Sequence, residues 1–324
     1  MKADCDARSM KVSWGLSEHR RAPYPVLTVG NFDGQHLGHR ALLRAVVGTA
    51  RAKGGTAVVL TFQPHPVTVL APAVELRLLS TFEEKLQRLE QAGIQEVVIV
   101  EFTPAFAALS PDAFVTQVLR DGIGVRELFV GEHFAFGKGR AGTLADLVRW
   151  SAAAGFEVHP VPPVRVDGEV ISSSRIRRLL QAGEVRGAAR CLGRPYTLSG
   201  VVTPGEQRGR SLGWPTANLR LPSGRVIPPD GVYATRVRWN ERTFDAASYL
   251  GRRPTFGPGE RLLEVYLLVE QVCLYDQMIQ VQFIERVRED RTFATPEALS
   301  AQIGQDVRVV REALKAAAEL AIES

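Results

Sequence analysis

Residues 24–39, YPVLTVGNFDGQHLGH, join a short apolar run to a glycine-containing loop, and this stretch decides the N-terminal fold. The run at 24–30 is typical of a buried strand, and apolar residues at helical spacing follow through residues 38–53. Small residues in the loop let a ligand approach the backbone, and the free N–H groups at a helix start favour phosphate. The stretch therefore predicts a strand, a phosphate-binding loop and a helix.

The same alternation continues to about residue 161. The predicted strands are 56–62, 96–102, 127–131 and 156–161, and the predicted helices are 81–93, 111–120 and 143–154. Alternating strands and helices predict an α/β domain with a parallel sheet. Ligands of such sheets bind beyond the carboxyl ends of the strands, where the loop after residue 30 lies. The first dozen residues of the chain are expected to be loosely ordered.

The sequence changes in character after about residue 190, where short β-rich runs are separated by glycine and proline. This pattern predicts an antiparallel barrel or sandwich, followed by an amphipathic helix near 296–320. The domain boundary is expected within residues 181–196, which gives a first domain at 1–188 and a second at 189–324.

Composition narrows the classes of protein to consider. The three cysteines (Cys5, Cys191 and Cys273) are far apart and form no CxxC pair, which argues against a disulfide framework and a cysteine zinc site. There is no long uncharged apolar run and no apolar signal segment, so a cytoplasmic protein without a membrane partner is expected. The net charge of +5 is spread along the chain, unlike the concentrated patch of most nucleic-acid binders.

His36 and His39 are three residues apart, so both side chains can reach one phosphate at the helix start. A single histidine is more often structural, but two in an HxGH pattern after a strand favour a functional pair. A metal site is the competing interpretation, and no convincing third ligand stands nearby. The loop is not a Walker A motif, because no GK followed by serine or threonine is present.

The loop resembles the HxGH signature of the nucleotidylyltransferase superfamily, and GNFDGQHLGH is similar to its prokaryotic FAD synthetase branch. Further blocks resemble that branch in the same order: TFQPHP at 61–66, FAALS at 106–110 with Phe114, GEHFAFG at 131–137 and ISSSRIR at 171–177. The resemblance implies a Rossmann-like nucleotidylyltransferase domain that joins FMN to AMP from ATP. Taken alone, ISSSRIRR would also fit a serine-capped basic helix start.

The chemistry implied is an attack of the FMN phosphate on the α-phosphorus of ATP, with pyrophosphate leaving. The nucleophile is already an anion, so positioning and charge neutralisation suffice. The resemblance implies that His36 and His39 hold the ATP phosphates, while Ser173, Ser174 and Arg177 clamp the β- and γ-phosphates. The other nucleotide contacts that it implies are Gly30, Asn31, Phe32, Asp33 and Gly38, and the flavin contacts are Phe62 and His133. His133 replaces an asparagine of the family motif.

Residues 200–218, GVVTPGEQRGRSLGWPTAN, resemble the riboflavin kinase signature. The resemblance implies an antiparallel β-barrel kinase domain with a terminal helix. It assigns Mg²⁺ to Thr216 and Asn218, whose oxygen atoms suit that hard cation. It assigns the nucleotide phosphates to Gly205, Gly209 and Arg210, although a glycine-rich stretch alone would be read as a plain loop.

Glu264 is the lone charge in the apolar run LLEVYLL at 262–268. Simple alternation would place it on the wet face of an edge strand, whereas the family has its catalytic glutamate at the matching position. There it would take the proton of the ribityl hydroxyl as that oxygen attacks the γ-phosphorus of ATP. Arg288 lies in a segment that resembles a family motif, and the resemblance implies a place near the flavin for it. The chain departs from the family pattern at Tyr249, Val269 and Asp276.

Together these resemblances imply a bifunctional enzyme with riboflavin, FMN and ATP as substrates, FMN and FAD as products, and Mg²⁺ as cofactor. Three alternatives are another nucleotidylyltransferase, a flavin-binding protein with a decayed site, and a basic RNA-binding protein. The kinase-like motif argues against the first, and the retained motif residues argue against the second. The even distribution of charge along the chain and the lack of an aromatic RNA-binding motif argue against the third. The sequence leaves open whether the chain forms a homo-oligomer.

Overall fold

The computed structural model describes residues 9–203, 214–252, 261–269, 272 and 274–322. The chain divides into two compact units, one up to Ser172 and one from Ser173 onward. Each unit has its own sheet and its own core.

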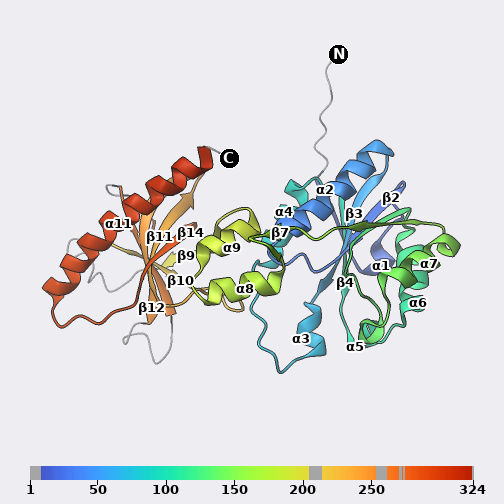
Figure 1. Cartoon of the computed structure of the whole chain (residues 1–324), viewed down its shortest axis with the longest axis horizontal. Coiled ribbons are helices and arrows are strands. Elements are labelled where there is room, and N and C mark those ends of the chain that lie inside the picture. The colour runs from blue at the N-terminus through green and yellow to red at the C-terminus, as the bar shows by residue number, and fades with distance from the viewer. Residues whose placement is uncertain (1–8, 204–213, 253–260, 270–271, 273, 323–324) are drawn as a thin grey trace, which may run out of the picture. The chain divides into compact units, whose positions relative to one another are not determined.

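The first unit is built on a six-stranded parallel sheet with the order β1-β4-β3-β2-β5-β6. Strands β2, β3 and β4 of this sheet are labelled in Figure 1. Its strands are β1 (Lys11–Trp14), β2 (Pro25–Val29), β3 (Thr56–Gln63), β4 (Glu96–Glu101), β5 (Glu127–Gly131) and β6 (Glu157–Val161). The chain runs from β2 outward through β3 to β4, and then returns to the other side of β2 for β5 and β6. The expected α/β domain with a parallel sheet is confirmed, and its strand order reverses beside β2.

Helices cover both faces of this sheet. They are α1 (Gly15–Glu18), α2 (Leu37–Ala52), α3 (Pro66–Leu70), α4 (Phe82–Gln91), α5 (Pro104–Ala107), α6 (Pro111–Ala113), the π-helix η1 (Phe114–Ile123), the 3₁₀ turn η2 (Lys138–Arg140) and α7 (Leu144–Ala154). One core packs α2 and α4 against the sheet, and the other packs η1 and α7 against its opposite face. A short hairpin, β7 (Arg165–Val166) with β8 (Glu169–Val170), follows the last strand.

Strand β1 was not predicted, and the expectation of a loosely ordered first dozen residues is wrong for Lys11 and Val12. A buried carboxylate explains the difference, because Glu96 Oε1 is 2.8 Å from Lys11 Nζ and 2.9 Å from His19 Nδ1. Ser13 adds a hydrogen bond of 3.3 Å to the same oxygen atom. Removing one partner from such a buried group is costly, so this cluster holds the first strand on the edge of the sheet.

The second unit contains a closed antiparallel barrel with the order β10-β13-β12-β11-β14-β9. Its strands are β9 (Tyr196–Thr203), β10 (Ala217–Arg220), β11 (Gly231–Trp239), β12 (Arg242–Arg252), β13 (Arg261–Leu267) and β14 (Met278–Glu289). Its helices are α8 (Ser173–Gln181), α9 (Val185–Leu192) and the terminal helix α11 (Pro296–Ile322). The expected antiparallel β-barrel with a terminal helix is confirmed.

Helices α8 and α9 lie in the sequence between the predicted α/β region and the predicted β-rich region. Helix α9 packs on β9 and β14, and Arg186 of α9 makes an ion pair of 2.8 Å with Glu285 of β14. The predicted boundary between residues 188 and 189 falls inside α9 and stays a prediction. Among the described residues, no helix combines the length and the apolar character needed to cross a bilayer.

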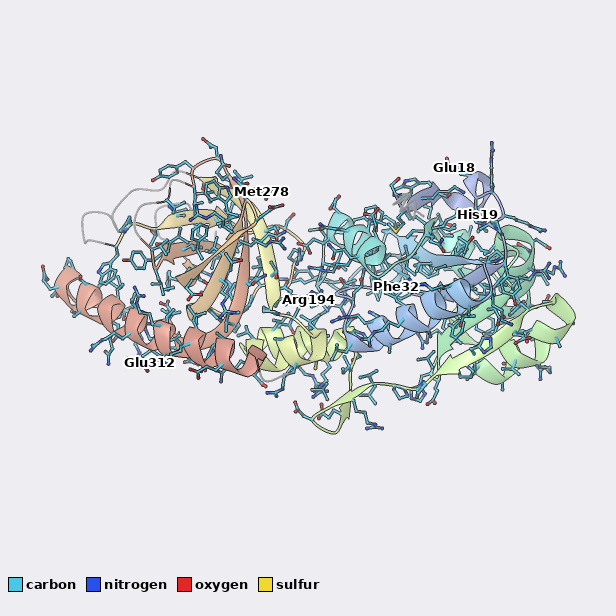
Figure 2. The ribbon with its side chains drawn as sticks, turned by 90° about the horizontal axis from the view of Figure 1, so that it is seen from above. Glu18, His19, Phe32, Arg194, Met278 and Glu312 are labelled. Atoms are coloured by element: carbon cyan, nitrogen blue, oxygen red, sulfur yellow. The ribbon has the colours of Figure 1, made fainter. Side chains whose placement is uncertain are left out.

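Helix α11 is fixed to the outside of the barrel by an apolar cluster and one buried ion pair. The cluster includes Val310 and Leu314 of the helix with Ile284 of β14. The ion pair joins Arg288 and Asp306, with Nη2 and Oδ2 2.8 Å apart and both side chains largely buried. Glu312, labelled in Figure 2, is exposed, as expected for the solvent side of an amphipathic helix.

We predict that Asp306→Ala lowers the free energy of unfolding by about 3–5 kcal/mol, because it leaves the Arg288 guanidinium buried without its counter-charge. The double variant Arg288→Met/Asp306→Leu should lose much less, since it removes both charges and keeps the volume. Urea unfolding followed by circular dichroism measures the difference. A single variant as stable as the double variant would contradict this role of the ion pair.

Candidate functional site

The two histidines of the HxGH motif lie together at the start of α2. His36 is the N-cap residue, and its Nδ1 accepts a hydrogen bond of 3.3 Å from the backbone N–H of His39. Because Nδ1 is the acceptor, the ring proton of His36 is assigned to Nε2. The two rings are stacked, with centroids 3.7 Å apart and planes 18° apart.

His39 is the second ring of this pair. Burial, with a smaller contribution from neighbouring His36, lowers the pKa of His39 well below its usual value. The ring is therefore neutral at physiological pH. Its Nδ1 is buried and has no hydrogen-bond partner among the residues that the structure describes. Such an atom indicates a missing ligand group or water.

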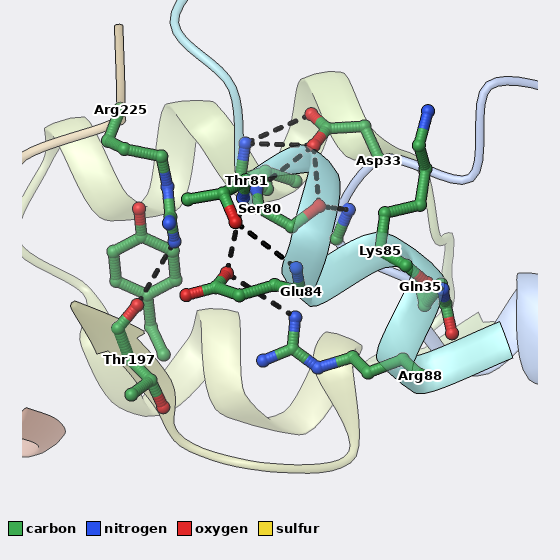
Figure 3. Close-up of polar contacts among 12 residues, drawn as sticks. Asp33, Gln35, Ser80, Thr81, Glu84, Lys85, Arg88, Thr197 and Arg225 are labelled. Atoms are coloured by element: carbon green, nitrogen blue, oxygen red, sulfur yellow. Dashed lines mark hydrogen bonds and ion pairs between the residues drawn. The ribbon is translucent and has the colours of Figure 1, made fainter. Parts of the chain in front are cut away.

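The loop that carries these histidines is held by the carboxylate of Asp33 (Figure 3). Asp33 accepts hydrogen bonds of 3.0 Å from Leu79 N, 3.1 Å from Ser80 N and 3.2 Å from Ser80 Oγ. Gly34 N donates to Ser80 Oγ at 3.1 Å, which closes the link to residues 79–80 from the other side. The predicted phosphate contact of Asp33 remains untested, and these bonds give its carboxylate a clear role as an anchor of the loop.

The anchored loop has an unusual backbone. Phe32 and Gln35 have left-handed φ values of 49° and 41°, which cost energy for residues with side chains. Gly34 has φ 77°, and a Cβ atom there would lie 2.8 Å from Leu79 Cδ1. Phe32, labelled in Figure 2, offsets part of this cost by burying its ring completely. The loop therefore depends on its neighbours for its shape.

Lys85 is a residue of this region that the sequence did not reveal. It is 8% exposed, and burial lowers its pKa to about 8 although the charge of Asp33 acts in the opposite direction. Its Nζ is 3.4 Å from Thr61 Oγ1 at the carboxyl end of β3, and its carbonyl oxygen accepts from Gln35 Nε2 at 2.8 Å. The position of this lysine among the apolar residues of the helix at 82–91 was the sequence signal that could have indicated its burial.

A cavity of about 270 Å³ opens beside the histidine pair. Its walls come from the carboxyl ends of β2, β5 and β6, where the strand order reverses, which is the usual ligand position in such sheets. Six predicted site residues line it: Gly30, Phe32, His36, Gly38, His39 and His133. The wall residues not predicted as site residues include Glu132, Phe134, the segment 161–164 and Ile171.

The remaining predicted residues of this motif set do not line the cavity. Phe62 belongs to an aromatic cluster on the η1 face, with its ring centroid 5.5 Å from Phe102 and 5.8 Å from Phe106. This cluster continues through Phe114 and Phe136 to Phe134, which does line the cavity. Asn31 is partly exposed in the loop. Ser173, Ser174 and Arg177 belong to α8, the first helix of the second unit.

In the barrel, Thr216, Asn218 and Glu264 lie together. Asn218 of β10 and Glu264 of β13 are direct cross-strand neighbours, and Thr216 Oγ1 is 3.5 Å from Glu264 Oε2. Asn218 is 5% exposed, and its Oδ1 has no hydrogen-bond partner within the described part of the chain. Hydroxyl, amide and carboxylate oxygens are the ligands that Mg²⁺ prefers, so this donor set fits the cation.

The structure describes only some of the other residues predicted for the barrel. Gly205, Gly209 and Arg210 lie outside the described residues, so the structure says nothing about them. The Arg288 guanidinium is bound to Asp306, and its centre is 5.7 Å from the ring of Phe293. Among the departures from the family pattern, Asp276 takes a left-handed φ of 60°, which explains how it replaces a glycine, and Val269 is exposed.

A second polar cluster lies at the opposite, amino-terminal ends of β5 and β6. Glu127, Glu157 and His159 place ligand atoms within 4.8 Å of one another. The Glu127 carboxylate is bound 2.5 Å from His159 Nε2 and 2.7 Å from Tyr24 Oη. Burial acts to raise the pKa of Glu127, but these hydrogen bonds hold it below its usual value. The contacts account for this buried carboxylate as a structural anchor.

A parallel sheet with an HxGH loop at its carboxyl edge, joined to a barrel with a Thr–Asn–Glu oxygen cluster, defines a two-domain nucleotide-dependent transferase. Comparison with family models agrees, since residues 19–175 match FAD synthetase and residues 192–314 match riboflavin kinase. The chain belongs to the family of bifunctional riboflavin kinase/FMN adenylyltransferases.

Relatives in this family match nearly the whole chain. The bifunctional riboflavin kinase/FMN adenylyltransferase of Escherichia coli K12 is 35% identical over 94% of this chain and 97% of its own length. That of Bacillus subtilis is 35% identical over 87% and 90%. A crystal structure titled macrolide-efflux protein from Streptococcus pneumoniae superposes with a TM-score of 0.85 at 29% identity, covering 93% of this chain and 99% of that one.

We predict that lowering the pH from 7.5 to 5.5 reduces the free energy of unfolding of the wild type by about 1 kcal/mol more than that of His39→Gln. The two proteins differ by the one histidine whose pKa is lowered on folding. The unfolded chain protonates this histidine below pH ~6.5, whereas the folded chain keeps it neutral, so acid favours unfolding. Urea unfolding of both proteins at the two pH values measures the effect. Equal pH dependence of both proteins would show that His39 takes up its proton in the folded state.

Proposed function

We propose that the chain phosphorylates riboflavin to FMN at the Glu264 cluster of the barrel and joins FMN to AMP, forming FAD, at the cavity beside His36 and His39. The family supports both activities. The observation that carries the proposal is that each unit brings residues of one family motif together in a donor set that suits the reaction. One is a stacked histidine pair at a helix start, and the other is an oxygen cluster on a strand face.

In the first unit, the proposed work of the histidine pair is to bind and stabilise the ATP phosphates. His36 Nε2 carries a proton that it can donate, and the N-terminus of α2 adds backbone N–H groups and the positive end of the helix dipole. A neutral His39 donates without a proton-transfer step. The FMN phosphate attacks the α-phosphorus as pyrophosphate leaves, and these fixed donors offset the negative charge that develops.

Apart from the histidines, the wall of the same cavity includes an aromatic residue, which is consistent with a flavin substrate. Phe134 lines the cavity and stacks on Phe136, with centroids 5.6 Å apart and planes at 17°. Flat apolar walls suit an isoalloxazine ring, and we propose Phe62 and His133 as further flavin contacts. For Ser173, Ser174 and Arg177 we propose the phosphate-clamping role of the family motif. Arg177 is suited to two parallel bonds with phosphate oxygens.

In the barrel, the proposed role of Glu264 is to orient the ribityl hydroxyl and accept its proton as that oxygen attacks the γ-phosphorus of ATP. Thr216 Oγ1 donates to the Glu264 carboxylate and thereby limits its orientation. We propose that Thr216 and Asn218 hold Mg²⁺, which supplies charge neutralisation for the ATP phosphates when bound. The buried, partnerless Oδ1 of Asn218 supports this assignment.

The setting of the protein is also part of the proposal. We propose that it works in the cytoplasm without a nucleic-acid or membrane partner, since the small charge surplus of +5 is spread along the sequence.

We predict that His36→Asn with His39→Gln lowers the rate of FAD formation by about 10²-fold or more, because two charge-stabilising donors are lost. Asparagine at position 36 keeps a good helix N-cap, so folding is preserved. Chromatography of the flavins formed from riboflavin and ATP should show FMN accumulating at the wild-type rate. Undiminished FAD output would refute the assignment of the adenylyl-transfer site.

For the kinase site, Glu264→Gln should lower FMN formation by about 10²–10⁴-fold, since the general base is lost while the side-chain shape is kept. Added FMN should still be converted to FAD at the wild-type rate. Glu289→Gln, an exposed glutamate of β14, serves as the matched control and should leave both rates unchanged. Normal kinase activity in Glu264→Gln would mean that another group takes the proton.

A further inference from the structure

A row of side chains crosses five strands on the outer face of the barrel. Asn218 of β10 pairs with Glu264 of β13, and Glu264 pairs with Tyr249 of β12. The row continues through Val232 of β11 to Arg288 of β14. We call these five residues the Glu264 row. Directly opposed residues of antiparallel strands point to the same face, so their side chains are neighbours.

The adjacent row shows that this face is the outer one. Leu219, Leu263 and Leu250 are paired across the same three strands and are completely buried. Interior and exterior positions alternate along each strand of a barrel, so the Glu264 row points outward. Tyr249 therefore lies between Glu264, the proposed base, and Arg288, for which the family motif implies a place near the flavin.

Tyr249 is held in a definite orientation. Its hydroxyl donates a hydrogen bond of 3.0 Å to Asp290 Oδ1, and the same oxygen atom accepts from Arg291 N at 2.8 Å. Burial and the nearby carboxylates raise the pKa of Tyr249, so the phenol keeps the proton that it donates.

The ring of Tyr249 lies along its own strand. A Cβ atom on Gly251 would be 2.2 Å from the Tyr249 hydroxyl oxygen and 2.4 Å from Cζ. The phenol therefore covers Gly251, and only glycine leaves room for it. Gly251 is the diagonal neighbour of Glu264 across β12 and β13, and such neighbours are separated by roughly 7–8 Å.

This arrangement places a flat aromatic surface on the same face of the sheet as the Glu264 carboxylate, which cross-strand pairing sets opposite Tyr249. No other aromatic ring among the described residues packs on Tyr249, whereas Trp214 and Tyr266 nearby contact each other at 5.2 Å. Riboflavin has an aromatic ring system at one end and the reacting hydroxyl at the end of a five-carbon chain. A ring that lies over the diagonal neighbour of Glu264 and a carboxylate on the same face can meet the two ends of one such substrate.

We propose that Tyr249 is a substrate-contacting residue of the kinase site, where its ring face receives the isoalloxazine of riboflavin while Glu264 meets the ribityl hydroxyl. The inference rests on the proposed function of the Glu264 cluster. It assigns a role in substrate recognition to a position at which this chain departs from its family. Asp290 is then a positioning residue that fixes the orientation of the ring.

The test uses the full-length protein with Tyr249→Ala, Tyr249→Phe and the control Tyr275→Phe, which alters an exposed tyrosine of a turn outside the Glu264 row. Tyr249→Ala should raise the Kd and KM for riboflavin about tenfold, because an aromatic stacking partner is lost. The KM for ATP and the conversion of FMN to FAD should stay at wild-type values.

Fluorescence of bound riboflavin gives a readout that a merely structural role would not change. A stacked tyrosine quenches excited flavin by electron donation, and phenylalanine does not. Tyr249→Phe should therefore bind riboflavin nearly as the wild type does, with brighter bound flavin, and Tyr275→Phe should behave as the wild type.

Wild-type affinity in Tyr249→Ala together with wild-type quenching in Tyr249→Phe would overturn the inference. A parallel rise of the KM for ATP would also overturn it, since the ring would then support the site generally. If the unaltered protein does not phosphorylate riboflavin, the proposed function itself fails. If the unaltered protein phosphorylates riboflavin normally and the Tyr249 variants bind and quench riboflavin as it does, only the role of Tyr249 is refuted.

Discussion

The hydrogen bonds between the Asp33 carboxylate and residues 79–80 are the constraint on which the first site depends. The loop after β2 contains two side-chain-bearing residues with left-handed backbone, and such a conformation persists only when its surroundings determine it. Asp33 supplies that support by accepting from Leu79 N and Ser80 N. The loop then ends at His36, whose ring caps α2 and stacks on His39. A strained loop, a helix start and a stacked histidine pair thus form the proposed phosphate-binding element.

The barrel positions its candidate groups without a strained loop. Its candidate groups lie on strands, where cross-strand pairing fixes the neighbours of each side chain. Asn218, Glu264 and Tyr249 need no strained backbone, because pairing of β10, β13 and β12 places them side by side. The ion pair of Arg288 with Asp306 ties α11 to the end of the same row. The candidate groups of the barrel are therefore held by strand pairing, whereas the His36–His39 pair depends on an anchored loop.

Local patterns predicted much of this structure, because strand–helix alternation and the glycine-containing loop are encoded in consecutive residues. The parallel sheet, an antiparallel barrel or sandwich and the histidine pair were predicted in this way, whereas the choice of a barrel and the other predicted residues of the cavity came from the resemblance to the family. Contacts between distant segments were not predictable, since no local pattern shows that Glu96 gathers Lys11 and His19 or that Arg288 meets Asp306. Lys85 was missed because a helical lysine is normally solvated, and only the packed structure shows it 8% exposed beside Thr61.

The central claim is that two sites on one chain act in sequence, and a time course of flavin products tests it most directly. The purified protein is incubated with riboflavin, ATP and Mg²⁺, and the flavins are separated by chromatography. We predict that FMN appears first and that FAD follows as FMN is consumed. FMN without FAD would contradict the assignment of adenylyl transfer to the His36–His39 site. The absence of both products would contradict the assignment of both reactions to this chain.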